Sequence, residues 1–198
     1  MFAREKCGVH NHQWREKPVK AKGRTLTMKK LSAILMALVL MLSTIPALAT
    51  ELNWSDYEAG VAQIEANTVT FDQISIQMWM PAVMQPVELA DEDKEAGFIG
   101  YFLSPDEACY VTVQYVDVGG MSLEEYAEYV PQIGGSGAQM MVINGIPCLN
   151  YDLEEEAATA VAYATEMGYI LQFTFGPYTD ENYASTMQVM VASIRPVE

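Results

Sequence analysis

Residues 140–153 read Met140-Met-Val-Ile-Asn-Gly-Ile-Pro-Cys-Leu-Asn-Tyr-Asp-Leu153 and contain the clearest turn signal in the chain. Asn144-Gly145 lies between two apolar runs, and Asn-Gly is the dipeptide that best accommodates the two positive-φ positions of a tight hairpin turn. The segment therefore predicts two antiparallel strands, over residues 140–143 and 146–153. A second hairpin is predicted directly afterwards, with strands over 158–165 and 169–175 joined across Met167-Gly168.

Three more strands are predicted earlier in the chain, the first and the last of them from alternating apolar and polar residues. They cover residues 72–80, 98–103 and 109–118, and Ser104-Pro-Asp-Glu107 forms the turn between the last two. In strand 169–175 the odd-numbered residues are expected to face the core, and Gln172 and Thr174 to face solvent.

Three helix starts follow from capping signals. Ser55 with Glu58 opens a helix through residue 66, Ser122 with Glu125 opens one that ends near residue 130, and Thr179 caps one that ends before Pro196. Short turns, not helices, join most neighbouring strands in the sequence, and such hairpins make adjacent strands antiparallel. We therefore expect an α+β fold, an antiparallel sheet of about six to seven strands with helices packed on it.

The 198 residues divide sharply by charge near residue 49. Residues 1–49 hold nine basic and two acidic side chains, a formal charge of +7. Residues 50–198 hold 24 acidic side chains against Lys94 and Arg195, a formal charge of −22. The two parts are therefore interpreted separately.

Residues 28–49 have the three parts of a secretory signal peptide in order. Lys29 and Lys30 precede an apolar run over residues 31–45, and Ala47-Leu-Ala49 supplies the small-x-small cleavage pattern. We expect cleavage after Ala49 and a secreted or extracytoplasmic product. An uncleaved N-terminal membrane anchor is the alternative, although the run is shorter than the ~20 residues that span a bilayer.

The chain then divides into four segments. Residues 1–27 are an upstream extension, either disordered or the result of a mis-assigned start, because Met28 begins a complete signal peptide. Residues 28–49 are the signal peptide, residues 50–68 a helical lead-in, and residues 69–198 the α+β domain.

The exported part excludes many activities by composition. It contains no histidine, which removes Ser-His-Asp and Cys-His nucleophiles and histidine-ligated metals. Its charge of −22 is unfavourable for nucleic acid and for anionic membrane surfaces, because both are bound through basic side chains. We expect no cofactor.

Cys109 and Cys148 are the cysteines of the exported part, where a disulfide could form. The alternation places Cys109 inward, with Val111 and Val113. It places Leu149 and Tyr151 inward on their strand, so Cys148 is expected on the opposite side. The pattern therefore favours free thiols over a disulfide between them.

Five stretches together resemble PsbP-like domains, which are named for an extrinsic subunit of photosystem II and share their fold with a Ran-binding nuclear-import factor. The stretches are Ile74-Ser-Ile-Gln-Met-Trp-Met-Pro81, Gly120-Met-Ser-Leu-Glu-Glu-Tyr126, Asn144-Gly-Ile-Pro147, Ala162-Tyr-Ala-Thr-Glu-Met-Gly-Tyr-Ile170 and Met190-Val-Ala-Ser-Ile-Arg-Pro196. The chain looks more like small secreted bacterial proteins of this fold, which have no assigned activity. The resemblance covers residues 69–196 and implies an antiparallel sheet between helices and a binding role, with no catalytic residue to transfer.

The acidic run Asp91-Glu-Asp-Lys-Glu95 is a weak calcium candidate through Asp91, Asp93 and Glu95. Its spacing does not fit an EF-hand, since the glycine comes at position seven of the loop rather than six. A solvated acidic loop is the alternative, and we expect no dedicated metal site.

The leading hypothesis is an exported, non-enzymatic binding or accessory protein of the bacterial envelope or extracellular space, expected to be a monomer. Its partner would be an envelope or extracellular protein or ligand. One alternative is a polysaccharide hydrolase with a pair of carboxylates about 5–10 Å apart in a cleft. The other is a ligand-storage or sensing domain, which would need a sizeable apolar pocket.

Overall fold

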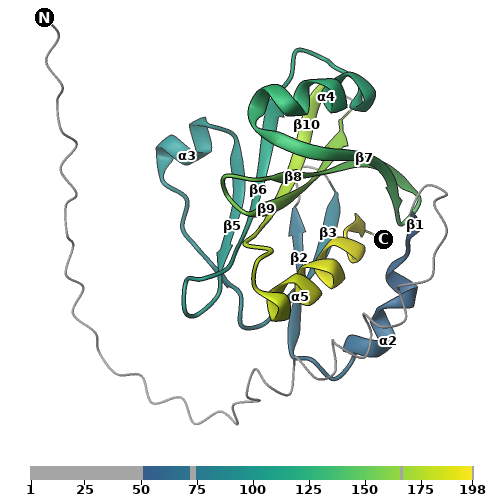
Figure 1. The fold of residues 1–198 in the computed structure, drawn as a ribbon. Coiled ribbons are helices and arrows are strands. Elements are labelled where there is room, and N and C mark those ends of the chain that lie inside the picture. Colours follow the sequence, from purple (N-terminus) through teal and green to yellow (C-terminus); the bar gives the residue numbers. More distant parts are fainter. Residues whose placement is uncertain (1–50, 72–74, 166, 198) are drawn as a thin grey trace, which may run out of the picture.

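The computed structural model describes residues 51–71, 75–165 and 167–197. Within them, eight strands form one large sheet in the order β1-β7-β8-β9-β10-β6-β5-β4 (Figure 1). Its strands are β1 (Glu51–Leu52), β4 (Gln85–Pro86), β5 (Phe98–Leu103), β6 (Tyr110–Asp117), β7 (Gly135–Ile143), β8 (Ile146–Leu153), β9 (Ala158–Ala164) and β10 (Tyr169–Gly176). A small sheet has the order β11-β3-β2 and consists of β2 (Ala66–Phe71), β3 (Ile76–Pro81) and β11 (Arg195–Pro196). The α+β class is confirmed.

The large sheet is mixed, so the expectation of a purely antiparallel sheet is wrong at one edge. There β1 runs parallel to β7, with Glu51 opposite Val142 and Leu52 opposite Ile143. Because no tight turn joins β1 to β7, no hairpin dictates their relative direction. The predicted strand at 72–80 also differs, since its described part is β3 of the small sheet and its first residues lie outside the described ranges.

Both predicted hairpins are present. Asn144 and Gly145 adopt positive φ angles of 49° and 78° between β7 and β8, as a two-residue hairpin turn requires. The other hairpin joins β9 to β10. The predicted pair over 98–103 and 109–118 is also present as β5 and β6.

Helices cover both faces of the large sheet (Figure 1). One face carries α4 (Leu123–Tyr129) with the short 3-10 helix η2 (Val130–Ile133), and the other carries α5 (Glu181–Ala192) with the small sheet. The short helices η1 (Trp54–Asp56), α2 (Glu58–Val61) and α3 (Asp91–Glu95) lie outside these layers.

Two hydrophobic cores result, one on each face of the sheet. On the α5 face, the rings of Phe71 and Phe173 meet edge-on with their centroids 5.6 Å apart. On the α4 face, Tyr126 packs edge-on against Tyr151 at 6.2 Å. The expected solvent face of β10 is therefore wrong, because α4 covers it and Thr174 is 4% exposed.

Two of the three predicted helix starts need correction. Ser122 caps α4 as predicted, accepting from the N–H of Glu125 at 3.2 Å while the Glu125 carboxylate accepts from the N–H of Ser122 at 2.8 Å. Asp180, not Thr179, caps α5, because its carboxylate accepts from two backbone N–H groups of the first turn at 2.9 and 3.1 Å.

The first predicted helix is much shorter than expected. Ser55 makes no capping bond, and the helical turns end at Val61 instead of residue 66. From Ala66 the chain is strand β2, where three consecutive β-branched residues, Thr68, Val69 and Thr70, favour an extended backbone. The lead-in is thus partly strand, and its β1 belongs to the large sheet.

Candidate functional site

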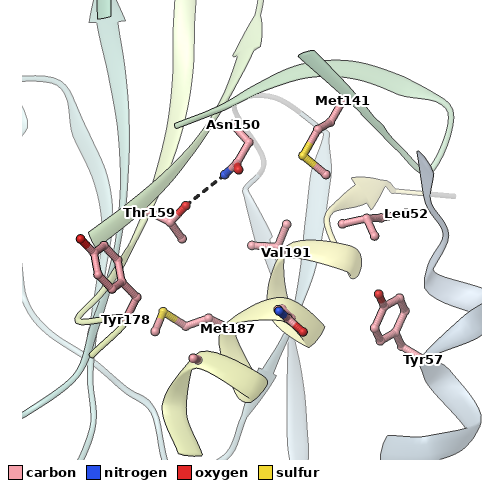
Figure 2. A pocket seen from close by; sticks show the side chains of 10 residues that line it. Leu52, Tyr57, Met141, Asn150, Thr159, Tyr178, Met187 and Val191 are labelled. Carbon is pink, nitrogen blue, oxygen red and sulfur yellow. Dashed lines mark hydrogen bonds between the residues drawn. The ribbon is translucent and has the colours of Figure 1, made fainter. Parts of the chain in front are cut away.

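A pocket of about 480 Å³ lies on the α5 face of the large sheet, beside the N-terminal segment (Figure 2). Its apolar lining consists of Leu52, Met141, Ala184, Met187 and Val191. Its polar lining consists of Tyr57, Asn150, Thr159, Tyr178 and Gln188. The pocket therefore has three walls, formed by the strands β7–β9, the helix α5 and the segment that contains β1 and η1.

The strand wall presents a pair of polar side chains in a fixed orientation. Asn150 of β8 donates from Nδ2 to the Thr159 hydroxyl oxygen and to the Ala160 carbonyl, both at 3.0 Å (Figure 2). Thr159 in turn donates to the carbonyl of Tyr151 at 3.3 Å. The amide oxygen of Asn150 accepts no hydrogen bond from the described residues. A bound ligand can thus donate to this oxygen.

The helix wall follows from the spacing of residues along α5. Ala184, Met187, Gln188 and Val191 recur at intervals of three and four residues, so they form one stripe of the helix. Met187 and Val191 are buried, whereas Gln188 is exposed. The stripe therefore forms an apolar wall with a neutral polar group at the mouth of the pocket.

The third wall is the N-terminal segment, which the β7–β8 turn holds in place. Asn144 accepts from the backbone N–H of Trp54 at 2.7 Å through Oδ1. This anchor places Leu52 and Tyr57 across the pocket from the helix α5 (Figure 2). Tyr57 is 4% exposed, and burial raises its pKa above the usual value for a phenol, so its hydroxyl stays protonated at neutral pH.

The chemistry of this lining suits binding. It contains no carboxylate, thiol, histidine, lysine or arginine. A general acid–base pair is therefore absent from the lining of this pocket. What the lining offers is apolar surface and a few neutral hydrogen-bonding groups, which is the usual composition of a ligand site.

Neither a family model nor a curated protein matches this sequence. Among solved structures, the chain is similar to cyanobacterial PsbP from Synechocystis, with a TM-score of 0.50 and 10% sequence identity, over 79% of this chain and 99% of that one. This chain has a PsbP-like fold. It also matches the Ran-binding protein Mog1p of Saccharomyces cerevisiae, with a TM-score of 0.40 and 10% identity, over 68% of this chain and 97% of that one. Such low identity concerns the fold alone, so the function of this PsbP-like domain is argued from its own residues.

The calcium candidates of the PsbP-like domain lie on α3, where they do not converge. Successive helical residues are rotated by about 100°, so Asp93 points away from Asp91 and Glu95. Asp91 pairs with the Lys94 ammonium at 3.3 Å, and Asp93 accepts from the Ala90 N–H at 3.1 Å. Within the described ranges, no three His, Cys, Asp or Glu side chains are grouped to hold a metal ion.

The two cysteines of the PsbP-like domain are free and buried, 4% exposed at Cys109 and 0% at Cys148. Both belong to the core on the α5 face, so the expectation that they face opposite ways is wrong. Leu149 and Tyr151 instead face α4, because both faces of this sheet are covered. Strand order keeps the thiols apart, since β9 and β10 separate β8 from β6 by roughly 14 Å, at about 4.8 Å per strand.

The remaining sequence signals do not add to the pocket. Cleavage after Ala49 concerns residues outside the described ranges. In the part of the chain that the structure describes, no helix has the length and apolar character needed to cross a bilayer. The pocket itself was not foreseen from the sequence, because its lining comes from segments between Leu52 and Val191 that no motif connects.

Proposed function

We propose that this chain is an exported, non-enzymatic binding protein of the bacterial envelope or extracellular space, and that its pocket on the α5 face receives an uncharged, largely apolar group. The observation that carries the proposal is the pocket itself. Its volume of about 480 Å³ lies within the range of ~300–1,000 Å³ typical of ligand sites. Its lining is apolar with neutral polar groups.

The pocket favours binding over the hydrolase alternative. A glycosidase needs two carboxyl groups about 5–10 Å apart on either side of the scissile bond. None of the lining residues is an acid. The missing histidine in residues 50–198 also removes the commonest general base.

Export is proposed from the sequence of residues 28–49 alone. To test it, the full chain is expressed in a bacterium, and the product outside the cytoplasm is examined by intact-mass analysis. We expect a chain that begins at Thr50 and contains two thiols, Cys109 and Cys148. A cytoplasmic product that retains Met1 or Met28 would contradict export.

Binding is tested with Nile red, a neutral apolar dye whose fluorescence rises when it leaves water. We compare two matched variants, each of which replaces an exposed glutamine with tryptophan. Gln188→Trp places an indole at the mouth of the pocket, and Gln132→Trp places one beside α4 on the opposite face. We expect Gln188→Trp to weaken dye binding by about tenfold, a change of ~1.4 kcal/mol, and Gln132→Trp to leave it unchanged. Equal dye binding by both variants would overturn the proposed site.

A further inference from the structure

Within the described residues, no strand pairs with the outer edge of β7 beside the pocket. β1 pairs with Val142 and Ile143 only, and no other described strand covers residues 135–141 on that side. The N–H of Asn144 points to this edge, because it donates to the carbonyl of Leu52 at 2.8 Å. Alternation along the strand then directs the backbone N–H of Met140 to the same edge, where no described strand pairs with it.

This open edge is continuous with the pocket. Met141 belongs to both, since it lies on β7 and its side chain lines the pocket (Figure 2). Strand alternation places Gln139 on the same face as Met141. β7 has a register shift between Ser136 and Gln139, with Gly137 at a φ angle of +64°, and is regular from Gln139 onward. A strand added along residues 139–141 would therefore direct alternate side chains toward the pocket.

Two exposed carboxylates lie on the elements that form the pocket, although none lines it. Asp152 is exposed and stands directly opposite Thr159 in the β8–β9 register, so the two side chains share a face. Glu181 is exposed and precedes Ala184 and Gln188 on the same stripe of α5. These groups favour a cationic partner around an apolar centre.

Neither of the two described basic residues, Lys94 and Arg195, forms an ion pair with these carboxylates. Lys94 lies on α3, beyond β5 at the other edge of the sheet, and pairs with Asp91. The Arg195 guanidinium lies 5.2 Å from the centroid of the Trp54 ring and donates to the Ser193 carbonyl at 2.9 Å. Asp152 and Glu181 are therefore available to a cationic partner.

We propose that an extended peptide segment of a partner protein binds as an added strand along residues 139–141 of β7, inserts one apolar side chain into the pocket, and places basic side chains near Asp152 and Glu181. This inference rests on the proposed function, because it names the occupant of the same pocket. Main-chain hydrogen bonds would provide affinity, and the pocket and the carboxylates would provide specificity.

The test uses a fluorescein-labelled peptide, Lys-Lys-Thr-Leu-Thr-Lys-Lys, acetylated and amidated at its ends, and measures anisotropy. In an extended conformation its leucine shares a face with two lysines, two positions away on either side. Two methylated versions of the peptide carry N-methyl groups on every second backbone amide. One is methylated on the odd-numbered residues and the other on the even-numbered residues, so each blocks one edge of the extended peptide. A third version has glutamate in place of lysine.

We expect one of the two methylated versions to bind about tenfold more weakly than the parent, because a strand pairs through one edge only. The glutamate version should not bind. Gln188→Trp should weaken binding of the parent by about tenfold, and Gln132→Trp should not. Glu181→Gln should weaken binding more than its matched control Glu128→Gln, which lies on α4.

Two results would overturn the inference while leaving the proposed function intact. One is that Nile red binds the pocket but both methylated versions bind as tightly as the parent peptide. The other is that a second copy of this chain covers β7, seen as a dimer by sedimentation that the peptide does not dissociate. Equal binding of Nile red by Gln188→Trp and Gln132→Trp would instead contradict the proposed function itself.

Discussion

The side chain of Asn144 accepts a hydrogen bond from the backbone N–H of Trp54 at 2.7 Å, although 90 positions separate the two residues. The same amide donates through Nδ2 to the carbonyls of Ala192 and Ile194, at 2.8 and 2.7 Å. One turn residue thus connects the β7–β8 hairpin to the N-terminal segment and to the end of α5. It holds together the three walls of the pocket.

Replacing Asn144 with glycine should lower the free energy of unfolding by about 2–3 kcal/mol, because three hydrogen bonds are lost at ~1 kcal/mol each. Glycine keeps the positive φ angle of the turn, so the backbone conformation itself is not strained. Urea unfolding followed by tryptophan fluorescence measures the change. Asn144→Asp is the companion variant, since it keeps the acceptor for Trp54 but loses both donors. A change within experimental error in Asn144→Gly would show that the turn does not anchor the lead-in.

Ser193 at the end of α5 links the helix to β3 in the same way. Its hydroxyl accepts from the backbone N–H of Trp79 at 2.9 Å and donates to the Met190 carbonyl at 2.6 Å, in a fully buried position. Ser193→Ala should destabilise the fold by about 1–3 kcal/mol, because the N–H of Trp79 is left buried without a partner. Ser185→Ala is the matched control on the same helix. Its hydroxyl bonds only to the Glu181 carbonyl, and equal losses in the two variants would contradict the role of Ser193.

The strands and turns of this fold could be predicted because their signals are local. Asn144-Gly145 specifies a hairpin turn by backbone preference, and β6 and β10 alternate apolar and polar residues over enough positions to be recognised. The Ser122 capping box succeeded for the same reason, since its two hydrogen bonds join residues three apart.

That Gln172 and Thr174 are covered could not be predicted from the sequence, because polar residues in a buried hydrogen-bond network have the same alternating pattern as residues that face solvent. Gln172 accepts hydrogen bonds from the hydroxyls of Tyr151 and Tyr126 and donates to Thr174 at 3.0 Å. These partners lie 46 residues away on α4 and 21 residues away on β8. Alternation of polar and apolar residues shows that two faces differ, but not that both are covered.

The pocket could not be predicted because it depends on where separate elements meet. Its lining combines β1, the strands β7–β9 and α5. The N-terminal segment is positioned by its pairing with β7 and by the bond between Asn144 and Trp54. Nothing in the sequence near Trp54 identifies this partner. The Ser55–Glu58 capping pattern instead predicted a longer helix in the same segment.

Gly97 is needed at the start of β5 for two reasons. Its φ angle is +91°, and a Cβ there would lie 2.4 Å from the backbone oxygen of Tyr115, which cannot move away without breaking the β5–β6 contact. Gly97→Ala should therefore destabilise by at least about 3 kcal/mol, combining left-handed backbone strain with overpacking. Gly119 also has a positive φ angle, +64°, but there is open space where its Cβ would lie. Gly119→Ala should therefore lower the free energy of unfolding only by the left-handed backbone strain, ~1–2 kcal/mol. Similar losses in both, measured by urea unfolding, would mean that the contact with Tyr115 relaxes.

The buried thiol of Cys148 should make the fold sensitive to alkaline pH. Burial raises the pKa of Cys148 to about 12, above the ~8.5 of an exposed thiol. Below pH ~8.5 the thiol is protonated in both states, so its stabilising contribution is complete. As the pH rises from there toward 12, the unfolded chain loses the proton first, and stability falls by ~1.4 kcal/mol per pH unit for this group.

Cys148→Ala isolates this contribution, since the variant has no thiol to ionise at that position. It should be less stable than the parent at neutral pH, because a smaller side chain leaves a cavity in the core. Between pH 9 and 10.5, however, its free energy of unfolding should decline less steeply, by about 1.4 kcal/mol per pH unit. Cys109 remains in both proteins, and burial raises its pKa to about 11, so its effect cancels in the comparison. Parallel pH profiles for the two proteins would mean that the Cys148 thiol ionises as easily in the folded state as in the unfolded one.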